Sequence, residues 1–440
     1  MIRFHIAPLL SGPRCGREDT PAGGVRLARS GNMRSDQEGV GRVPRLVNGL
    51  VLDVRAGEFR RHDVGIEGDR ITAVVEAGID RTGELLDGEG LYLLPGLIDS
   101  HVHLVMRGED ADPAANAARS DDQVRRYAME AATRTVLGGV TAVRDVGGWN
   151  YVEMDVRSAI ERGEIAGPRL FLAGRLLSAP TPAVEYYPGM YEVTGNADEV
   201  AQAARRQFDR GADLVKVMAS GAMLSPEDED AAQPQLGREE IGAAVRVARD
   251  HRRHVAAHAH ALEGIRNAMQ AGVASIEHCT FVDADGATEL ARREVLVVAT
   301  MAAFRTSLLD DRATREMPPH IHQRFVENER IHTDAIRRTL LQGVAQAMGT
   351  DAGTPGNHHG ANAQECALLV EEVGLSPIEA IRAATVHPAR LLQRPGELGV
   401  VAAGAKADLV GYMGNPLEDI HELTRAKFVM KAGRVLKDER

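Results

Sequence analysis

Short apolar runs recur along the middle of the chain, and each is followed by ten or more residues with helical character. Continuous apolar strands that alternate with helices are typical of a parallel sheet covered by helices. Eight such units over roughly 300 residues predict a (β/α)8 TIM barrel. A doubly wound open sheet is the alternative, but no Gly-x-Gly-x-x-Gly turn follows the first run. The runs lie at residues 93–103, 140–145, 169–174, 212–218, 254–258, 274–278, 295–300 and 346–351.

The stretches before and after these runs show a different pattern. From Arg45 to about Glu89, short apolar stretches alternate with polar positions around a Gly-Asp turn, which is typical of antiparallel strands. Residues 407–412 and 427–435 show the same alternation near the other end of the chain.

This contrast predicts three parts. Residues 45–94 and 397–440 are expected to pair into one small, discontinuous β-sandwich domain, with the barrel at residues 95–396 inserted between its halves. Residues 1–44 are rich in Gly, Arg and Ser and are expected to form a disordered tail, with Met33 as an alternative start of the natural protein.

Composition and charge narrow the range of partners. The 440 residues carry a net charge of −11 and no long basic run, which argues against nucleic acid or an anionic membrane surface as a partner. No apolar stretch reaches the roughly 18 to 20 residues that span a bilayer. Three scattered cysteines (Cys15, Cys279 and Cys366) indicate a reducing compartment without a disulfide framework. We therefore expect a cytoplasmic protein.

The first apolar run ends in two histidines, His101 and His103, separated by one residue. Residues i and i+2 of a strand point to the same face, so both imidazoles would project together and can grip one metal ion. Metal-capable side chains also end four later runs, and the carboxyl ends of barrel strands meet at one face. The candidate ligands are His101, His103, Lys216, His258, His278 and Asp351.

Lys216 lies inside an apolar strand, where its ammonium would be poorly solvated. Burial favours the neutral amine, which can add carbon dioxide to give a carbamate. A carbamate is an anionic oxygen ligand that can bridge two cations. A lysine that extends to the barrel mouth is the alternative interpretation.

Together these motifs resemble the amidohydrolase superfamily, whose first barrel strand carries a Pro-Gly-Leu-Ile-Asp run before His-x-His, here at residues 95–103. Residues 139–145, 375–385 and 414–420 resemble the imidazolonepropionase-related branch, which includes Xaa-Pro and Xaa-Arg/Lys dipeptidases and ochratoxinase-type amidases. The resemblance covers roughly residues 45–440. Imidazolonepropionase uses a single metal without a carboxylated lysine, so Lys216 favours the peptidase-like members.

The resemblance implies a binuclear metal-dependent amidohydrolase. One divalent ion would be held by His101, His103 and Asp351. The other would be held by His258 and His278, with carboxylated Lys216 and an attacking hydroxide bridging the two. Zinc suits these ligands best, with manganese, cobalt or iron as alternatives.

The resemblance also implies catalytic residues and a substrate class. Asp351 would take the proton of the attacking water and pass it to the departing nitrogen, and His260 would face the substrate. The substrate would be an amide with a free carboxylate on the leaving amino acid: a dipeptide, an N-acyl amino acid or an ochratoxin-like aryl amide. Many barrels of this group form homo-oligomers. Candidate substrate contacts are Tyr187, Tyr191, Arg305 and His359.

One departure and two alternatives remain. Residues 178–188 replace the Gly-Gly-His-Gly loop of many relatives, so specificity does not transfer from any one of them. A hydrolase that opens a cyclic amide of the imidazolone or hydantoin type is the first alternative. A barrel retained only for assembly is the second, and the six filled ligand positions argue against it.

Overall fold

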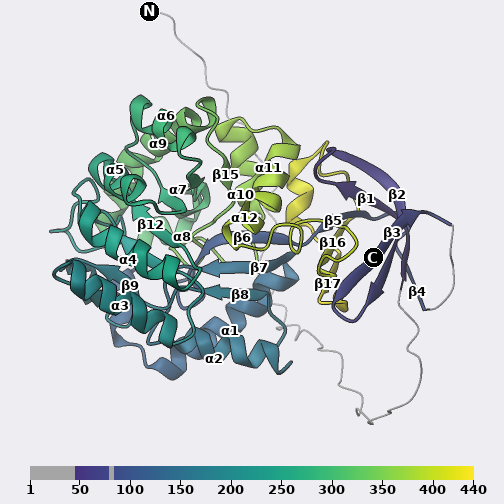
Figure 1. Cartoon of the computed structure of the whole chain (residues 1–440), viewed down its shortest axis with the longest axis horizontal. Helices are drawn as coiled ribbons and strands as arrows, with labels where there is room; N and C mark the ends of the chain where they lie inside the picture. Colours follow the sequence, from purple (N-terminus) through teal and green to yellow (C-terminus); the bar gives the residue numbers. More distant parts are fainter. Residues whose placement is uncertain (1–44, 79–83) are drawn as a thin grey trace, which may run out of the picture. The chain divides into compact units, whose positions relative to one another are not determined.

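Both ends of the chain contribute strands to one mixed sheet. The computed structural model describes residues 45–78 and 84–440, so the predicted tail at residues 1–44 lies outside the described residues (Figure 1). The hydrogen-bonded order is β18-β17-β16-β5-β1-β2-β3, with β4 beside β1. The strands are β1 (Arg45–Asp53), β2 (Glu58–Glu67), β3 (Arg70–Glu76), β4 (Leu85–Asp87), β5 (Tyr92–Pro95), β16 (Leu409–Tyr412), β17 (Phe428–Lys431) and β18 (Arg434–Asp438).

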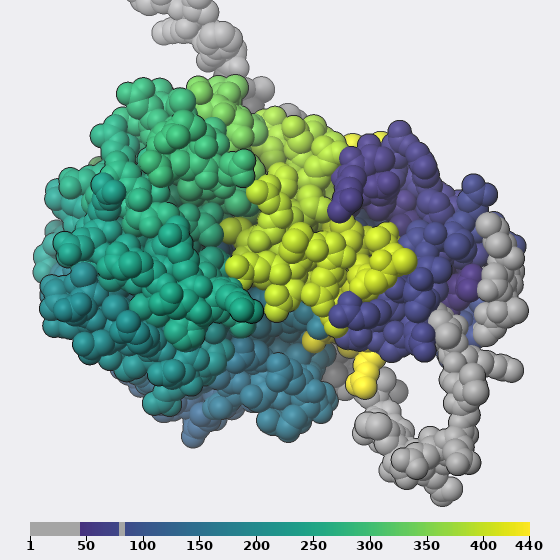
Figure 2. Space-filling view, in the orientation of Figure 1, coloured from purple at the N-terminus to yellow at the C-terminus, as the bar shows by residue number. Residues whose placement is uncertain are grey.

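Antiparallel pairing of β5 with β16 joins the two ends, with Leu94 opposite Val410. Figure 1 shows the purple N-terminal strands beside the yellow C-terminal ones, and in Figure 2 the C-terminal residues lie against both the purple strands and the helices. The hydrogen bonds give one continuous sheet. The two facing layers of a sandwich, and domain limits at residues 94 and 397, stay predictions.

The middle of the chain alternates parallel strands with helices. A strand lies in each of the eight predicted runs, and these strands pair in parallel. The third run turns at Gly174, which has a φ of 73°, so that β8 pairs with β7 and β9 pairs with β11. The strands are β6 (Leu97–Val102), β7 (Val140–Asp145), β8 (Arg169–Leu172), β9 (Leu176–Ser178), β10 (Tyr191–Val193), β11 (Val215–Met218), β12 (Val255–Ala259), β13 (Ser275–His278), β14 (Leu296–Val298) and β15 (Gln346–Ala347).

Backbone hydrogen bonds connect the last of these strands to the first. The amide of Ser100 donates to the carbonyl of Met348 at 2.8 Å, and the amide of Asp351 donates to the carbonyl of His101 at 2.7 Å. The last strand therefore lies beside the first, and because the strands are parallel, their carboxyl ends point the same way.

The helices lie outside these strands (Figure 1) and bury small apolar faces against them. In α3, for example, Val200, Ala203 and Ala204 are buried at helical spacing. None of the helices in the described residues combines the length and hydropathy of a membrane span. The α-helices are α1 (Asp121–Leu137), α2 (Val152–Glu161), α3 (Ala197–Asp209), α4 (Arg238–Asp250), α5 (Leu262–Ala271), α6 (Ala284–Arg292), α7 (Met301–Leu309), α8 (Asp311–Glu316), α9 (Pro319–Leu341), α10 (Gln364–Leu368), α11 (Pro377–Ala383) and α12 (Val386–Leu391). Shorter turns are the 3-10 helices η1 (Pro113–Ala118), η2 (Pro182–Glu185) and η4 (Ile420–Thr424) and the π-helix η3 (Leu369–Val373).

The carboxylate of Asp99, which is fully buried in β6, hydrogen-bonds to both the first of these strands and the segment just after the last. Its Oδ1 accepts the amides of His101 (3.0 Å) and Thr350 (3.1 Å). Its Oδ2 accepts the hydroxyl of Thr350 (2.6 Å) and the amide group of Asn362 (2.8 Å). One carboxylate thus holds the first strand, the last strand and the segment before α10 together.

We predict that Asp99→Ala lowers the free energy of unfolding by about 2 to 4 kcal/mol, because four buried donors lose their acceptor. Urea unfolding monitored by circular dichroism measures this. The control is Asp53→Ala, since Asp53 is an exposed aspartate in β1 whose carboxylate accepts the nearby amides of Arg55 and Ala56. Equal losses in the two variants would contradict this role of Asp99.

Candidate metal centre

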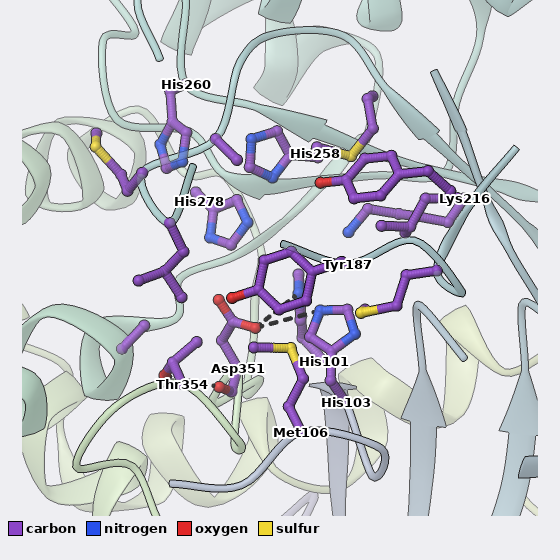
Figure 3. Close-up of a pocket in the computed structure, with 18 of the residues that line it drawn as sticks. His101, His103, Met106, Tyr187, Lys216, His258, His260, His278, Asp351 and Thr354 are labelled. Carbon is purple, nitrogen blue, oxygen red and sulfur yellow. Dashed lines mark hydrogen bonds and ion pairs between the residues drawn. The ribbon is translucent and has the colours of Figure 1, made fainter. Parts of the chain in front are cut away.

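All six candidate ligands line one pocket at the carboxyl ends of the parallel strands, with a volume of about 670 Å³ including its open mouth (Figure 3). Each of their side chains is buried or nearly so, because each projects inward from a strand end or the residue just after it. The ligand residues come from β6, β11, β12 and β13 and from the turns after β6 and β15.

The first cluster consists of His101, His103 and Asp351. The Nε2 atoms of both histidines lie 3.4 Å from Asp351 Oδ1. That oxygen is buried and has no hydrogen-bond partner. A buried carboxylate oxygen facing two imidazole nitrogens is a suitable place for a cation.

Each histidine of the predicted ligand set has one ring nitrogen engaged by the protein, which leaves the other for a ligand. The carbonyl of Gly147 accepts from His103 Nδ1 at 3.0 Å, and that of Gly221 accepts from His258 Nε2 at 3.0 Å. Glu277 Oε2 lies 2.8 Å from His101 Nδ1. The open nitrogen is therefore Nε2 in His101 and His103, but Nδ1 in His258.

The second cluster consists of His258, His260 and His278. The ring of His260 stacks on that of His278 at 4.7 Å between centroids and meets His258 edge-on at 4.6 Å. His260 was predicted as a catalytic residue beside the ligands. Its ring lies about as close to the ring of His278 (4.7 Å between centroids) as the ring of His258 does (4.6 Å). In this geometry His260 can serve as a third ligand of an ion bound by His258 and His278.

Two threonine relays set the tautomers of His260 and His278. The hydroxyl of Thr300 donates to the Ala299 carbonyl (2.7 Å) and accepts from His278 Nδ1 (2.8 Å). His332 Nε2 donates to the same carbonyl (2.8 Å), so the Nδ1 atom of His332 carries no proton and accepts from the Thr280 hydroxyl (3.1 Å). The oxygen of that hydroxyl then accepts from His260 Nδ1 (2.7 Å). Both metal-facing histidines therefore keep an unprotonated Nε2.

Lys216 is buried in β11, and its amine points toward the space between His258 and His103 (Figure 3). Burial lowers the pKa of Lys216 to about 8, against the opposing charges of Glu277 and Asp351. A far larger share of this amine is neutral near pH 7 than of a lysine in water.

The remaining charges favour metal-binding protonation states. Burial raises the pKa of Asp351, but the nearby His101, His103 and Lys216 outweigh it and lower the pKa to about 2. Burial lowers the pKa of His103 to about 4 and that of His258 to about 3. Neutral imidazoles and an ionised carboxylate are the forms that bind metal.

The predicted substrate contacts divide into two groups. Tyr187 and Tyr191 line the pocket. Arg305 does not, because it lies on the outer side of α7 and pairs with Glu329 and Glu372, each at 3.0 Å. His359 does not line it either: its Nε2 is 3.2 Å from the His103 carbonyl and 3.1 Å from that of Met106, so it supports the turn after β6.

Residues that sequence reasoning missed hold the loop between β11 and α4 over the pocket. The Arg324 guanidinium, on α9, donates to five backbone carbonyls of this loop, from Met223 to Glu229. The Glu229 carboxylate accepts the amide of Ala222 (3.0 Å) and also that of Ala183 (3.0 Å), in the segment that carries Tyr187. No sequence motif marks these contacts, since they join segments about 50 to 100 residues apart.

Comparison with known proteins identifies the family of this chain. Residues 92–436 match the model of the amidohydrolase family, so the chain belongs to that family. It is 30% identical over 379 residues to an ochratoxinase from Aspergillus niger (78% of this chain, 75% of that protein). It is 28% identical over 357 residues to an imidazolonepropionase from Nocardia farcinica (76% and 80%). The solved structure of a Xaa-Pro dipeptidase with methionine bound in its active site matches with a TM-score of 0.82 at 30% identity (90% of this chain, 99% of that one).

We predict that Arg324→Lys loosens the β11–α4 loop, because a lysine offers three donors without the planar fork of arginine. Protease Glu-C, which cuts after Glu227 and Glu229, should cleave this loop about 10-fold faster, while the melting temperature changes little. The control is Arg312→Lys on α8, where Arg312 is exposed and pairs with Glu316. Cleavage at the wild-type rate in Arg324→Lys would contradict the conclusion that Arg324 holds the β11–α4 loop in place.

Proposed function

We propose that this chain is a binuclear metal-dependent amidohydrolase that cleaves the C–N bond of a linear amide by adding water across it. The observation that carries the proposal is the meeting of two ligand clusters in one buried pocket, with the Lys216 amine facing the space between them. Parallel pairing of the strands, together with the backbone hydrogen bonds from the β15 segment back to β6, supports the (β/α)8 barrel predicted from the sequence, with the pocket at its carboxyl-terminal mouth.

The donors in the pocket fit two divalent ions, most suitably zinc. The unpartnered Asp351 Oδ1 and the Nε2 atoms of His101 and His103 would hold one ion. His258 and His278 would hold the other, each through the ring nitrogen that the protein leaves open. When bound, such ions polarise a substrate carbonyl and lower the pKa of a bound water.

Lys216 would supply the bridge. Its neutral amine attacks carbon dioxide, a nitrogen–carbon bond forms, and the displaced proton passes to solvent. One carbon–oxygen π bond of the carbon dioxide opens, and the product is a carbamate that keeps the Lys216 nitrogen as an N–H and adds two oxygens that share one negative charge. Support for this step comes from the burial of Lys216 and from the lowered pKa of its amine.

The remaining steps fall to side chains already in place. The Asp351 carboxylate accepts a proton from the attacking water and returns it to the departing nitrogen, so that the products are a carboxylic acid and an amine. Glu277 holds His101 in one orientation through the 2.8 Å contact to its Nδ1. The Tyr187 hydroxyl, buried and without a partner, donates to the substrate carbonyl oxygen.

A single-ion hydrolase of cyclic amides is the second candidate. The compact cluster of His258, His260 and His278 favours it, because these three alone offer a complete set of protein ligands for one zinc. Similarity to an imidazolonepropionase points the same way. The cytoplasmic location and the homo-oligomer inferred from the sequence remain predictions.

Lys216→Ala separates the two candidates. We predict about two metal ions per wild-type chain and about one in the variant, together with a loss of at least roughly 100-fold in linear-amide cleavage. Elemental analysis and a panel of linear amides, a hydantoin and an imidazolone measure this. Lys216→Glu, which restores a carboxylate, is expected to recover part of both.

One ion per wild-type chain, or turnover that does not respond to Lys216→Ala, would reject the binuclear mechanism. Preferred opening of the cyclic amides would then establish the second candidate.

A further inference from the structure

Beyond the candidate ligands, the pocket is lined mainly by methionine and aromatic side chains. Phe304, on α7, lies 5.2 Å from Phe325, on α9, between ring centroids. Methionines adapt their shape to a bound ligand, whereas packed phenylalanines form a rigid apolar wall. The side chains concerned are Met106, Met190, Met218, Met223, Phe304 and Phe325.

This lining offers no partner for a negatively charged substrate group. Among the described residues, Lys216 is the only lysine or arginine that lines the pocket, and the proposed function turns it into an anion. Surrounding arginines are engaged elsewhere: Arg119 donates to Asp110, Arg305 pairs with two glutamates, and Arg324 holds loop carbonyls. A carboxylate on an arm of the substrate, away from the two proposed ions, would lose its hydration without gaining a lysine or arginine partner.

Acidic residues lie close to the lining of the pocket. Tyr186 packs beside Tyr187, with 6.4 Å between ring centroids. Burial raises the pKa of Tyr186, the charges of Asp112, Glu185 and Asp228 raise it further, and the charge of Arg324 lowers it. The carboxylates that act on this hydroxyl therefore outnumber the cations. An anionic substrate would approach the pocket against their field.

We propose, on the basis of the function proposed above, that the pocket takes amides whose two arms are apolar and uncharged. N-aryl and N-arylalkyl carboxamides are the class that fits the lining. The Tyr187 hydroxyl is an uncharged donor suited to the one polar group of such a substrate, its amide. This class departs from the carboxylate-bearing leaving group predicted from the sequence, because Arg305, the one cation among the predicted substrate contacts, pairs with Glu329 and Glu372 and does not line the pocket.

A matched pair of substrates tests the proposal. N-phenethylbenzamide and N-benzoyl-L-phenylalanine differ only by the carboxylate on the leaving amine. We expect the metal-loaded wild-type protein to cleave the neutral amide with a kcat/KM about 10-fold or more higher. An equal or higher kcat/KM for the acid would overturn the proposal.

Binding without turnover keeps this test separate from the proposed function. N-phenethylbenzenesulfonamide and N-benzenesulfonyl-L-phenylalanine repeat the pair with a bond that amide hydrolysis does not cleave. Calorimetry with the metal-loaded protein should give tighter binding of the neutral sulfonamide. Tighter neutral binding without cleavage of any amide would reject the proposed reaction but keep the substrate class. Tighter binding of the acid would overturn the class whatever the reaction.

A variant with an added cation tests why the neutral amide is preferred over the carboxylate substrate. Leu224 lines the pocket and is half-buried, so an arginine there can reach both the pocket and solvent. Leu224→Arg should shift the kcat/KM ratio about 10-fold toward the carboxylate substrate. Leu224→Gln, similar in length but uncharged, should leave the ratio near that of the wild type. Equal ratios in both variants and the wild type would contradict the missing-cation argument.

Discussion

The buried pair of Arg144 and Glu277 is the interaction on which the pocket most depends. Both side chains are fully buried, and a charge in that position is tolerated only with a partner and full hydrogen bonding. The guanidinium donates to both Glu277 oxygens (2.8 and 2.9 Å), to the Ser100 carbonyl (2.6 Å) and to the Ser275 hydroxyl (3.0 Å). Glu277 then orients His101. Arg144 in β7 thus connects β6 with β13 beneath both ligand clusters.

A left-handed residue ends β13 and also follows each of the next two strands, β14 and β15, which is a second constraint on the pocket. His278, Thr300 and Asp351 have φ values of 70°, 52° and 58°, although none is glycine. Each such residue costs on the order of 1 kcal/mol or more. The conformation turns His278 and Asp351 inward and places Thr300 against His278 Nδ1. The hydrogen bonds and packing of the strands offset this strain, and the result is a pocket whose polar groups are held before any ligand arrives.

The meeting of the six candidate ligands in one pocket was predictable because their positions follow from local rules. His101 and His103 share a face through strand alternation, and parallel strands bring their carboxyl ends to one region. The residues that sequence reasoning missed act through packing between segments that are far apart in the chain, which no local pattern reveals. His332 belongs to a 23-residue helix, and nothing in its neighbours reveals that it reaches Thr280. Arg305 was misleading for the related reason that a position just after a strand says little about which side of the following helix faces the pocket. The turn at Gly174, which splits the third strand, also lacked a local signal.

Anomalous diffraction from crystals of the metal-loaded protein tests the central claim most directly, because it locates each ion independently of turnover. We predict two peaks in the pocket, one contacted by His101, His103 and Asp351 and the other by His258 and His278. Density for a carbamate should extend from the Lys216 amine to both. A single peak enclosed by His258, His260 and His278, beside an unmodified Lys216, would contradict the binuclear account.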